Sequence, residues 1–234
     1  LLMAGAANAI NMSLYAKPPY DTLRDLAPVS LSVKGANVLL VHPSLPVKTL
    51  RELLALARAR PGALNYASSG MGSANHMAGE LLKLVAKVNI AHVPYKGNAP
   101  ALTDLIGGHV EILISGVPAV IGQIKNGRVR AIAIASLKRF PALPDTPTID
   151  ESGLKGFEAT TWFGVMAPIK TPREIVTRLN SDLARITVAA DVRERFIGEG
   201  VEPIGGTPEL FAAFIREEID KYAKVVKAAG LTAD

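Results

Sequence analysis

The chain lacks cysteine altogether and has no long hydrophobic run. Without cysteine in 234 residues, disulfide frameworks and thiolate metal sites are excluded. Although 49% of the residues are hydrophobic, no run approaches the roughly 20 apolar residues that a membrane-spanning helix needs. Aromatic residues make up only 5%, with a single tryptophan. The length and the apolar content predict a globular chain of one large or two small domains, each with a proper core.

The charge is mildly positive and evenly spread. The 26 lysines and arginines are scattered among 21 acids, which leaves a formal net charge of +5. The densest basic patch, Lys125 to Arg130, has no interleaved aromatic residues on which bases could stack. We therefore expect no nucleic-acid partner, and the positive balance suits a small anionic ligand.

The N-terminal residues show no targeting signal. The opening stretch LLMAGAANAINMSLY has neither a basic region nor a small-residue cleavage site, so it does not read as a signal peptide. LLMAG resembles the end of a strand entered partway along, which suggests that the natural protein begins earlier.

Strand-like and helix-like patterns alternate along the chain. Continuously apolar runs predict strands at 37–42, 63–69, 89–95, 110–116, 129–136 and 159–168. Helical patterns separate the first five of these runs, and further helices are expected to begin near Thr171, Asp191 and Thr207. Strands joined through helices favour parallel pairing in a sheet that is buried on both faces. The segment 137–158 is rich in proline and turn residues and marks a break in this α/β pattern.

The stretch SSGMGSANH, which lies between a predicted strand and a predicted helix, is suited to hold an anion. Gly70 and Gly72 allow sharp turns that expose backbone N–H groups, Ser69 and Ser73 can add hydroxyl donors, and the helix start contributes about half a positive charge. Ligands of open α/β sheets bind beyond the carboxyl ends of the strands, which is where this loop is expected. The alternative is an ordinary strand-to-helix turn in which Ser73 is the N-cap.

More specific motifs do not fit this loop. No lysine precedes Ser73, as a phosphate-binding P-loop requires, and Asn75 stands where a dinucleotide fingerprint has a third glycine. Ser69 lacks the glycine two positions earlier that a hydrolase nucleophile elbow uses. His76 and Glu80 stand four residues apart and could ligate a metal, but the metalloprotease motif is absent, and a histidine in a first helical turn is usually a packing or hydrogen-bonding residue.

The other three histidines, His42, His92 and His109, stand singly at strand edges or in loops. No nearby acid or nucleophile stands at a spacing that indicates a catalytic pair with any of them. The sequence therefore assembles no catalytic set.

Polar residues follow the neighbouring strands as well. Tyr95 and Lys96 come after one strand, Ser115 and Gly116 after the next, and Thr160 and Trp162 lie on the last strand. Because strand ends of a parallel sheet meet at one edge, these residues are candidates for the same site. The alternative for Tyr95 and Trp162 is that both are core aromatics.

Six motifs occur in order along the chain: PPYDTLRDLAPVS, HPSLPVKTLREL, YASSGMGSANHMAGELLK, HVPYKGNAPALTDLIGGHV, ALPDTPTIDESG and WFGVMAPIKTP. Together they resemble the Bug, or TctC, family of extracytoplasmic solute receptors of tripartite tricarboxylate transporters. The resemblance extends from Ala9 to Asp234.

This resemblance implies a two-lobed, type II-like periplasmic binding protein in which each lobe is a mainly parallel sheet flanked by helices. Lobe 1 would comprise residues 1–32 and 157–234, and lobe 2 residues 33–156. Such a receptor is not an enzyme and uses no cofactor or metal. It closes about a hinge over a small organic acid in the cleft between its lobes, and delivers it to membrane transporter subunits from the periplasm. Dicarboxylates, tricarboxylates, acidic amino acids and aromatic acids all fit that description.

The family's ligand-binding positions are carried over residue by residue. The loop that holds one carboxylate corresponds to Ser68, Ser69, Gly70, Gly72, Ser73 and His76. The family's YKG segment corresponds to Tyr95, Lys96 and Gly97, and the next strand end to Ser115 through Pro118. A loop with the family pattern AINP corresponds to residues 9–12, with Ala9 and Asn11 as candidate contacts, and Thr160 and Trp162 complete the set.

The sequence also departs from the family pattern. Family members begin with a strand and a proline-glycine loop that grips a second carboxylate, and this chain lacks that segment, so lobe 1 is expected to be truncated at its N-terminus. Met12 replaces the usual proline, and the segment from Ser115 to Val120 lacks a common acid or amide. Two alternatives to a receptor stay open. One is a serine-dependent α/β hydrolase that uses Ser69 with His76, and the other, which follows from the missing segment, is a truncated scaffold that binds no ligand.

Overall fold

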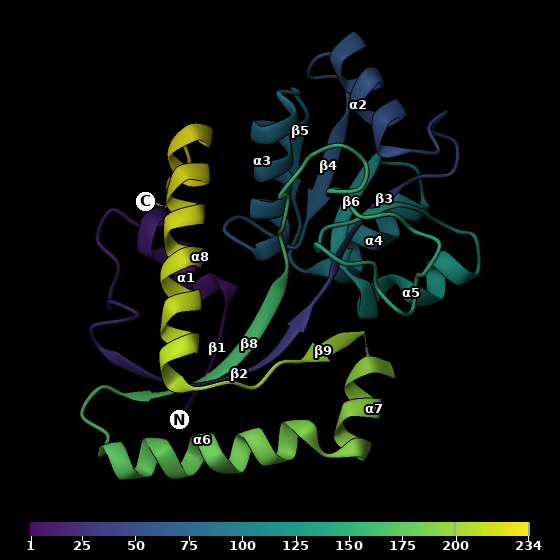
Figure 1. Cartoon of the computed structure of the whole chain (residues 1–234). Helices are drawn as coiled ribbons and strands as arrows, with labels where there is room; N and C mark the ends of the chain where they lie inside the picture. The colour runs from purple at the N-terminus through teal and green to yellow at the C-terminus, as the bar shows by residue number, and fades with distance from the viewer. Residues whose placement is uncertain (199, 234) are drawn as a thin grey trace. The chain divides into compact units, whose positions relative to one another are not determined.

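The computed structural model describes residues 1–198 and 200–233, and the chain divides into two compact units (Figure 1). Unit 1 consists of residues 1–35 and 161–234, and unit 2 of residues 36–160. The boundaries expected from the sequence lay at 32/33 and 156/157. They differ because β2 (Leu26–Gly35) and β8 (Thr161–Pro168) stay paired to their ends, with Gly35 opposite Thr161.

Unit 2 contains a five-stranded sheet in the order β5-β4-β6-β3-β7. Its strands are β3 (Asn37–Val41), β4 (Asn65–Ser68), β5 (Ala91–Pro94), β6 (Ile112–Gly116) and β7 (Arg130–Ile134). β4 pairs in parallel with β5 and β6, whereas β3 pairs antiparallel with both β6 and β7. The sheet is therefore mixed, and the expectation of a mainly parallel sheet was wrong.

The direction of β3 explains this correction. The helix-connected strands β4, β5, β6 and β7 all run the same way, as right-handed crossovers require. β3 follows β2 after a single residue, enters the sheet between β6 and β7, and runs in the opposite direction. A helix between two strands therefore determines neither their relative direction nor the strand that lies beside them: the helix at Leu50–Ala59 joins β3 to β4, and these two strands run in opposite directions.

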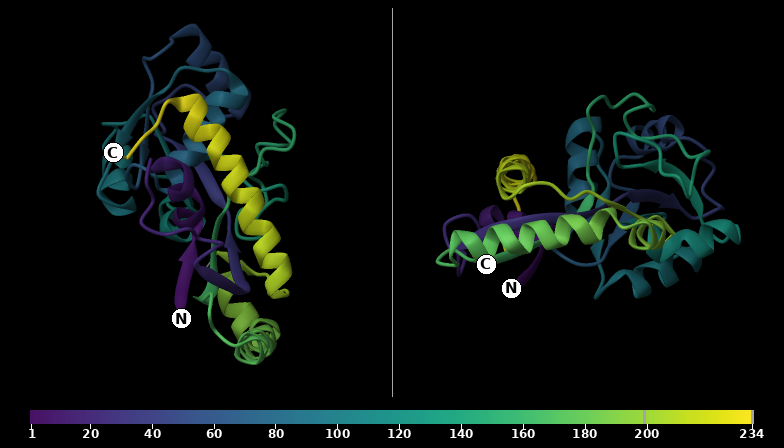
Figure 2. Two further views of the ribbon diagram at one scale, coloured as in Figure 1. Left: turned by 90° about the vertical axis from the view of Figure 1, so that its left-hand side faces the viewer. Right: turned by 60° about the horizontal axis from the view of Figure 1, so that its bottom comes forward.

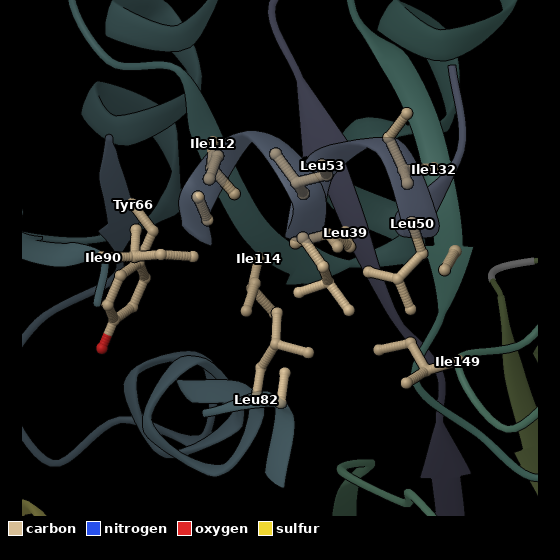
Figure 3. Close-up of a cluster of buried hydrophobic side chains, with 14 of the residues drawn as sticks. Leu39, Leu50, Leu53, Tyr66, Leu82, Ile90, Ile112, Ile114, Ile132 and Ile149 are labelled. Atoms are coloured by element: carbon tan, nitrogen blue, oxygen red, sulfur yellow. The ribbon is translucent and has the colours of Figure 1, made fainter. Parts of the chain in front are cut away.

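Helices cover both faces of the unit 2 sheet. The face that carries Leu39 and Val41 packs against α2 (Leu50–Ala59) and α3 (Ala74–Ala86), and Figure 3 shows part of this cluster. The face that carries Val38 and Leu40 packs against α4 (Asn98–Ile106) and α5 (Val117–Lys125). Because side chains alternate along a strand, a continuously apolar β3 supplies both clusters, as the sequence predicted.

The proline-rich segment 137–158 has no helix or longer strand, yet it belongs to the core of unit 2. Phe140 and Leu143 join one apolar cluster, and Ile149 and Phe157 join the other. The sequence correctly predicted an irregular segment. We also expected it to be too polar to form a core element, but these four apolar side chains are buried in the core.

Unit 1 contains a four-stranded sheet in the order β1-β8-β2-β9, with β1 (Leu2–Gly5) and β9 (Val201–Pro203) at its edges. Its three pairings are all antiparallel, so the expected parallel sheet is corrected here as well. The same physical reason applies. β1 and β2, which are joined through α1 (Ala6–Leu14), run the same way, but β8 lies between them.

Long helices lie on both sides of the unit 1 strands (Figures 1 and 2). Val165 and Ala167 of β8 pack against α6 (Arg173–Val188), whereas Trp162 on the other face meets Phe211 of α8 (Pro208–Ala229) edge-on. Gly164 allows this close packing, because a Cβ atom there would lie 2.3 Å from the Phe211 ring. A shorter helix, α7 (Ala190–Gly198), precedes β9.

Candidate functional site

The candidate site begins with the donor loop, which we define as residues 68–73 between β4 and α3. Its geometry depends on two glycines with positive φ, +132° at Gly70 and +69° at Gly72, which side chains with a Cβ rarely adopt. Ser73 is the N-cap of α3: its Oγ accepts the N–H of His76 at 3.2 Å and donates to the Gly70 carbonyl at 2.7 Å. The ordinary reading of Ser73 as an N-cap is therefore correct, and its hydroxyl is occupied within the loop.

Two further donors of the loop are also occupied. The N–H of Gly72 donates to Nδ1 of His76 at 3.1 Å, and the N–H of Gly70 donates to Oγ of Ser68 at 3.1 Å. Within residues 1–198 and 200–233, no acceptor is found for the N–H groups of Ser69, Met71, Ala74 and Asn75. These four amides, rather than that of Gly72, are the donors that the loop offers to an anion.

The other strand ends lie beside this loop within unit 2. The N–H of Tyr95 donates to the Ser68 carbonyl at 3.1 Å, and the N–H of Gly97 donates to the Ser69 carbonyl at 3.2 Å. The Tyr95 hydroxyl donates to Asp104 at 2.7 Å, and burial together with that carboxylate raises the pKa of Tyr95 to about 12. Tyr95 is thus a fixed neutral side chain at the rim, while Lys96 is exposed beside it.

Ser115 and Gly116 end β6, which is the neighbour of β4 in the sheet. Ser115 is completely buried, and Gly116 is the N-cap of α5. Thr160, the last residue of unit 2, is 4% exposed. Apart from these, the edge carries Asn37, which the sequence analysis missed: it pairs with Gly116 and donates its side-chain N–H to the Ala159 carbonyl at 2.8 Å. The sequence does contain a signal for this residue, because an asparagine begins a strand that is otherwise apolar.

The candidate residues of unit 1 lie in a different setting. Ala9 and Asn11 are within α1, so the loop expected at residues 9–12 is a helix; Ala9 is completely buried, and Asn11 is partly exposed. Trp162 is also completely buried, and its indole N–H donates to Glu218 at 3.0 Å. Trp162 is therefore a core aromatic of unit 1, the alternative considered above, and we drop it from the candidate site.

The helices that start at these strand ends share an electrostatic feature. α3, α4 and α5 follow β4, β5 and β6, α1 follows β1, and none of the four has an acidic residue in its first turn. The other helices, α2, α6, α7 and α8, each have one. An acid in the first turn offsets the positive end of the helix dipole, so each of these four helix starts keeps its positive potential for an anion.

The side chains behind the donor loop do not form a catalytic or metal site. The hydrolase hypothesis paired Ser69 with His76, but Nδ1 of His76 accepts the N–H of Gly72, and the Ser69 hydroxyl accepts from the Asn75 side-chain amide at 3.5 Å. A serine–histidine contact does exist between Ser68 and Nε2 of His92, at 2.7 Å. Ser68 is fully buried, however, and in the described part of the chain no carboxylate is hydrogen-bonded to His92.

The metal hypothesis for His76 and Glu80 also finds no support. Nε2 of His76 lies 3.9 Å from Glu80, whose carboxylate instead accepts from Tyr66 at 2.7 Å and from Lys83 at 2.8 Å. Over the described ranges 1–198 and 200–233, no group of three or more histidine or acidic side chains is arranged to hold a metal ion.

A cavity of about 680 Å³ lies elsewhere in unit 2, beside β7 and the start of α2. Lys48, Arg51 and Asp145 are among its lining residues, and none of the candidate site residues is. Among the described residues no helix is long and apolar enough to cross a membrane.

An α/β chain of two compact units with donor loops at its strand ends has the fold of the periplasmic solute-binding proteins. The chain belongs to the TctC family, whose model, described as "Tripartite tricarboxylate transporter family receptor", matches residues 1–231. Among its relatives, the protein BugT of Bordetella pertussis is 38% identical over 230 residues, which cover 98% of this chain and 71% of BugT.

Solved structures are similar over the whole chain. A protein of R. palustris solved with adipate is 37% identical, with a TM-score of 0.88, and the match covers 98% of this chain and 77% of that one. The periplasmic binding protein BugD is 33% identical, with a TM-score of 0.85 and coverages of 99% and 78%. MatC from Rhodopseudomonas palustris with bound malate is 31% identical, with a TM-score of 0.83 and coverages of 96% and 78%. These proteins are solute-binding receptors, not enzymes.

Proposed function

We propose that this chain is a periplasmic receptor that binds a small organic acid and delivers it to the membrane subunits of a tripartite carboxylate transporter. The observation that carries the proposal is the set of acid-free helix starts at the strand ends, next to the unpaired amides of the donor loop. Two relatives of the same fold are named with adipate and with malate, both of which are dicarboxylates. In this proposal the chain acts by binding alone and catalyses no reaction.

One carboxylate of the ligand is held at the donor loop. Its oxygens accept from the N–H groups of Ala74 and Asn75 at the start of α3 and from those of Ser69 and Met71 in the loop. Backbone amides at a helix start bind an anion without a salt bridge, and such charge-assisted hydrogen bonds are stronger than neutral ones. We also propose that both units contribute to binding and close over the ligand, as a hinge mechanism requires.

A screen of small carboxylates tests the proposal. Thermal unfolding of the chain is followed with adipate, malate, citrate, glutamate and benzoate, and each hit is confirmed by calorimetry. A ligand that binds only the native state raises its stability by about 2.7 kcal/mol at a hundredfold excess over Kd. If no acid shifts the transition, the receptor proposal fails and the non-binding scaffold is favoured. Covalent labelling of a serine by a phosphonate probe would instead favour the hydrolase.

A pair of glycine variants locates the site. Gly72→Val is expected to abolish binding, because valine strains a backbone at φ +69° and distorts the donor loop. Gly127→Val is the matched control, since Gly127 has the same φ of +69° and no atom would lie within 4 Å of its Cβ. Both variants carry a similar backbone strain, but only the first is expected to lose the ligand. Equal ligand affinities in the two variants would exclude the donor loop as the binding site.

A further inference from the structure

Two histidine rings stack directly behind the donor loop. His76 of α3 and His92 of β5 have ring centroids 3.9 Å apart and an interplanar angle of 19°, and Tyr66 of β4 stacks on His92 at 4.8 Å. His76 is 1% exposed. Its Nε2 has no hydrogen-bond partner among the described residues and lies 3.9 Å from the Glu80 carboxylate, so the hydrogen bond of this ring is the one through Nδ1.

Each ring makes a hydrogen bond to one end of the donor loop. Nδ1 of His76 accepts the N–H of Gly72 at 3.1 Å. Nε2 of His92 lies 2.7 Å from Oγ of Ser68, and the same Oγ accepts the N–H of Gly70 at 3.1 Å. The two glycine turns of the loop are thus both connected to the stacked rings, one directly and one through Ser68.

From these contacts we propose that His76 and His92 are positioning residues of the donor loop, which hold it in its anion-binding conformation only while both rings are neutral. The ligand-binding part of this inference rests on the proposed carboxylate site. An imidazolium has no free lone pair, so a protonated Nδ1 of His76 can no longer accept the N–H of Gly72. Two protonated rings at 3.9 Å would also repel each other.

The charged and titratable groups around the histidine pair come from three elements. Glu80 and Lys83 of α3 lie on the same helix as His76, Tyr66 faces the rings from β4, and His92 stands on β5. Lys83 and the Tyr66 hydroxyl both donate to Glu80, so its carboxylate is already paired. Burial lowers the pKa of His76, and burial together with the neighbouring His76 ring lowers the pKa of His92 to about 4. Both rings are therefore neutral at pH 7, and acid protonates them.

Nuclear magnetic resonance of the ligand-free chain tests the loop directly. The imidazole and backbone amide signals are followed from pH 7.5 to 3.5, with circular dichroism to verify that the chain stays folded. We expect the amide signals of Gly70 and Gly72 to shift with the same midpoint as the rings of His76 and His92. The amide of Gly122, in α5, serves as the reference and should not follow that midpoint. If the rings titrate while both loop amides stay unchanged, the inference is overturned.

Calorimetry with adipate tests the effect on binding. In the double variant His76→Asn and His92→Gln, amide groups replace the ring nitrogens that contact the loop, and neither side chain can be protonated. The ratio of wild-type to variant Kd at each pH cancels the protonation of adipate itself. If binding requires the loss of one ring proton, we expect this ratio to rise by about tenfold for each unit by which the pH falls below the pKa of that ring. His109→Gln, at an exposed histidine, should keep the wild-type profile.

The two experiments separate the two proposals. If neither wild type nor variant binds adipate at pH 7.5, the ligand proposal fails for this acid, and the resonance titration still decides whether the rings control the loop. A constant Kd ratio across the pH range, with binding intact, overturns the inference while the proposed function stands. If the double variant does not fold, the wild-type titration decides alone.

Discussion

At the residue scale, the most demanding contact in unit 2 is between Gly79 of α3 and Tyr66 of β4. A Cβ atom at Gly79 would lie 2.2 Å from the Tyr66 ring, so the helix approaches the sheet as closely as it does only because this residue is glycine. The same ring donates its hydroxyl to Glu80 and stacks on His92. Gly79 therefore sets the position of the aromatic ring that supports the histidine pair.

We predict that Gly79→Ala destabilises the protein by about 1–3 kcal/mol, the usual cost of overpacking, even though alanine favours a helix. Gly122→Ala in α5 is the matched control, since nothing lies within 4 Å of the added Cβ, and it should stabilise by about 0.5–1 kcal/mol. Urea unfolding of both variants measures the difference. Equal or increased stability of Gly79→Ala would show that Tyr66 moves aside at no cost.

The pH dependence of stability is a second prediction at this scale. The pKa of His92 falls from 6.5 in its ordinary state to about 4 in the fold, chiefly because the ring is buried. The unfolded chain therefore binds a proton between these pH values that the folded chain does not, and the stabilising contribution is present in full above pH 6.5. Stability should fall as the pH drops from 6.5 toward 4. Denaturant unfolding at several pH values checks this, and His92→Gln should flatten that part of the profile; a flat wild-type profile would contradict it.

Some candidate residues could be predicted from the sequence, whereas their roles could not. A glycine-serine loop before a helix identified the donor loop and Ser73 as an N-cap, because both signals are local. The hydrogen bond from the Gly72 amide to Nδ1 of His76 spans only four residues, but the residue types alone do not indicate it. That His92 lies behind the same loop depends on the pairing of β4 with β5. The burial of Trp162 depends on α8, which is more than 40 residues away in sequence, and no local pattern indicates that contact.

At the element scale, the sequence predicted the helices and strands of unit 2 well, because each has local boundary signals. Helix α2 is the clearest example. Thr49 accepts the N–H of Glu52, and the Glu52 carboxylate accepts the N–H groups of Thr49 and Lys48, which together form a capping box. Neighbouring strands could not be predicted in the same way. The insertion of β3 between β6 and β7, and of β8 between β1 and β2, follows from contacts distant in sequence.

The capping box of α2 gives the prediction at this scale. Thr49→Ala removes the side-chain acceptor of the Glu52 N–H and should lower the free energy of unfolding by about 1 kcal/mol. Thr49→Ser keeps the hydroxyl and is expected to stay close to the wild type. Chemical denaturation monitored by circular dichroism compares the three proteins. If alanine and serine variants were equally stable, the cap would contribute nothing to the fold.

At the scale of the whole molecule, the two units differ in how the chain builds them. Unit 2 is one continuous segment with apolar clusters on both faces of its sheet. Unit 1 joins two segments that are separated by all of unit 2, and its central pair, β2 and β8, takes one strand from each. The sequence indicated this discontinuous arrangement through family resemblance. The proline-rich segment 137–158 ends close to the second crossing at 160/161, but no composition change marks the first crossing at 35/36.

The ends of unit 2 are tied together within the unit. The N–H of Ala135 donates to the Asn37 carbonyl, the N–H of Ala159 donates to the Ala135 carbonyl, and the Asn37 side chain donates to the Ala159 carbonyl. These three hydrogen bonds form a closed ring that joins the segment entering unit 2 to the segment leaving it. Asn37 is completely buried, so this ring is shielded from water.

We therefore predict that residues 36–160 fold on their own. A continuous segment of this size, with a core on both faces of its sheet and its two ends tied together, contains the contacts that a domain needs. The isolated segment should show a cooperative urea transition and dispersed amide resonances, while Asn37→Ala in the same segment should lower its stability by about 1–3 kcal/mol, because the Ala159 carbonyl loses its buried donor. A segment that unfolds without cooperativity would show that unit 2 depends on unit 1 for its stability, and would rule out closure by independently folded units as the basis of ligand capture.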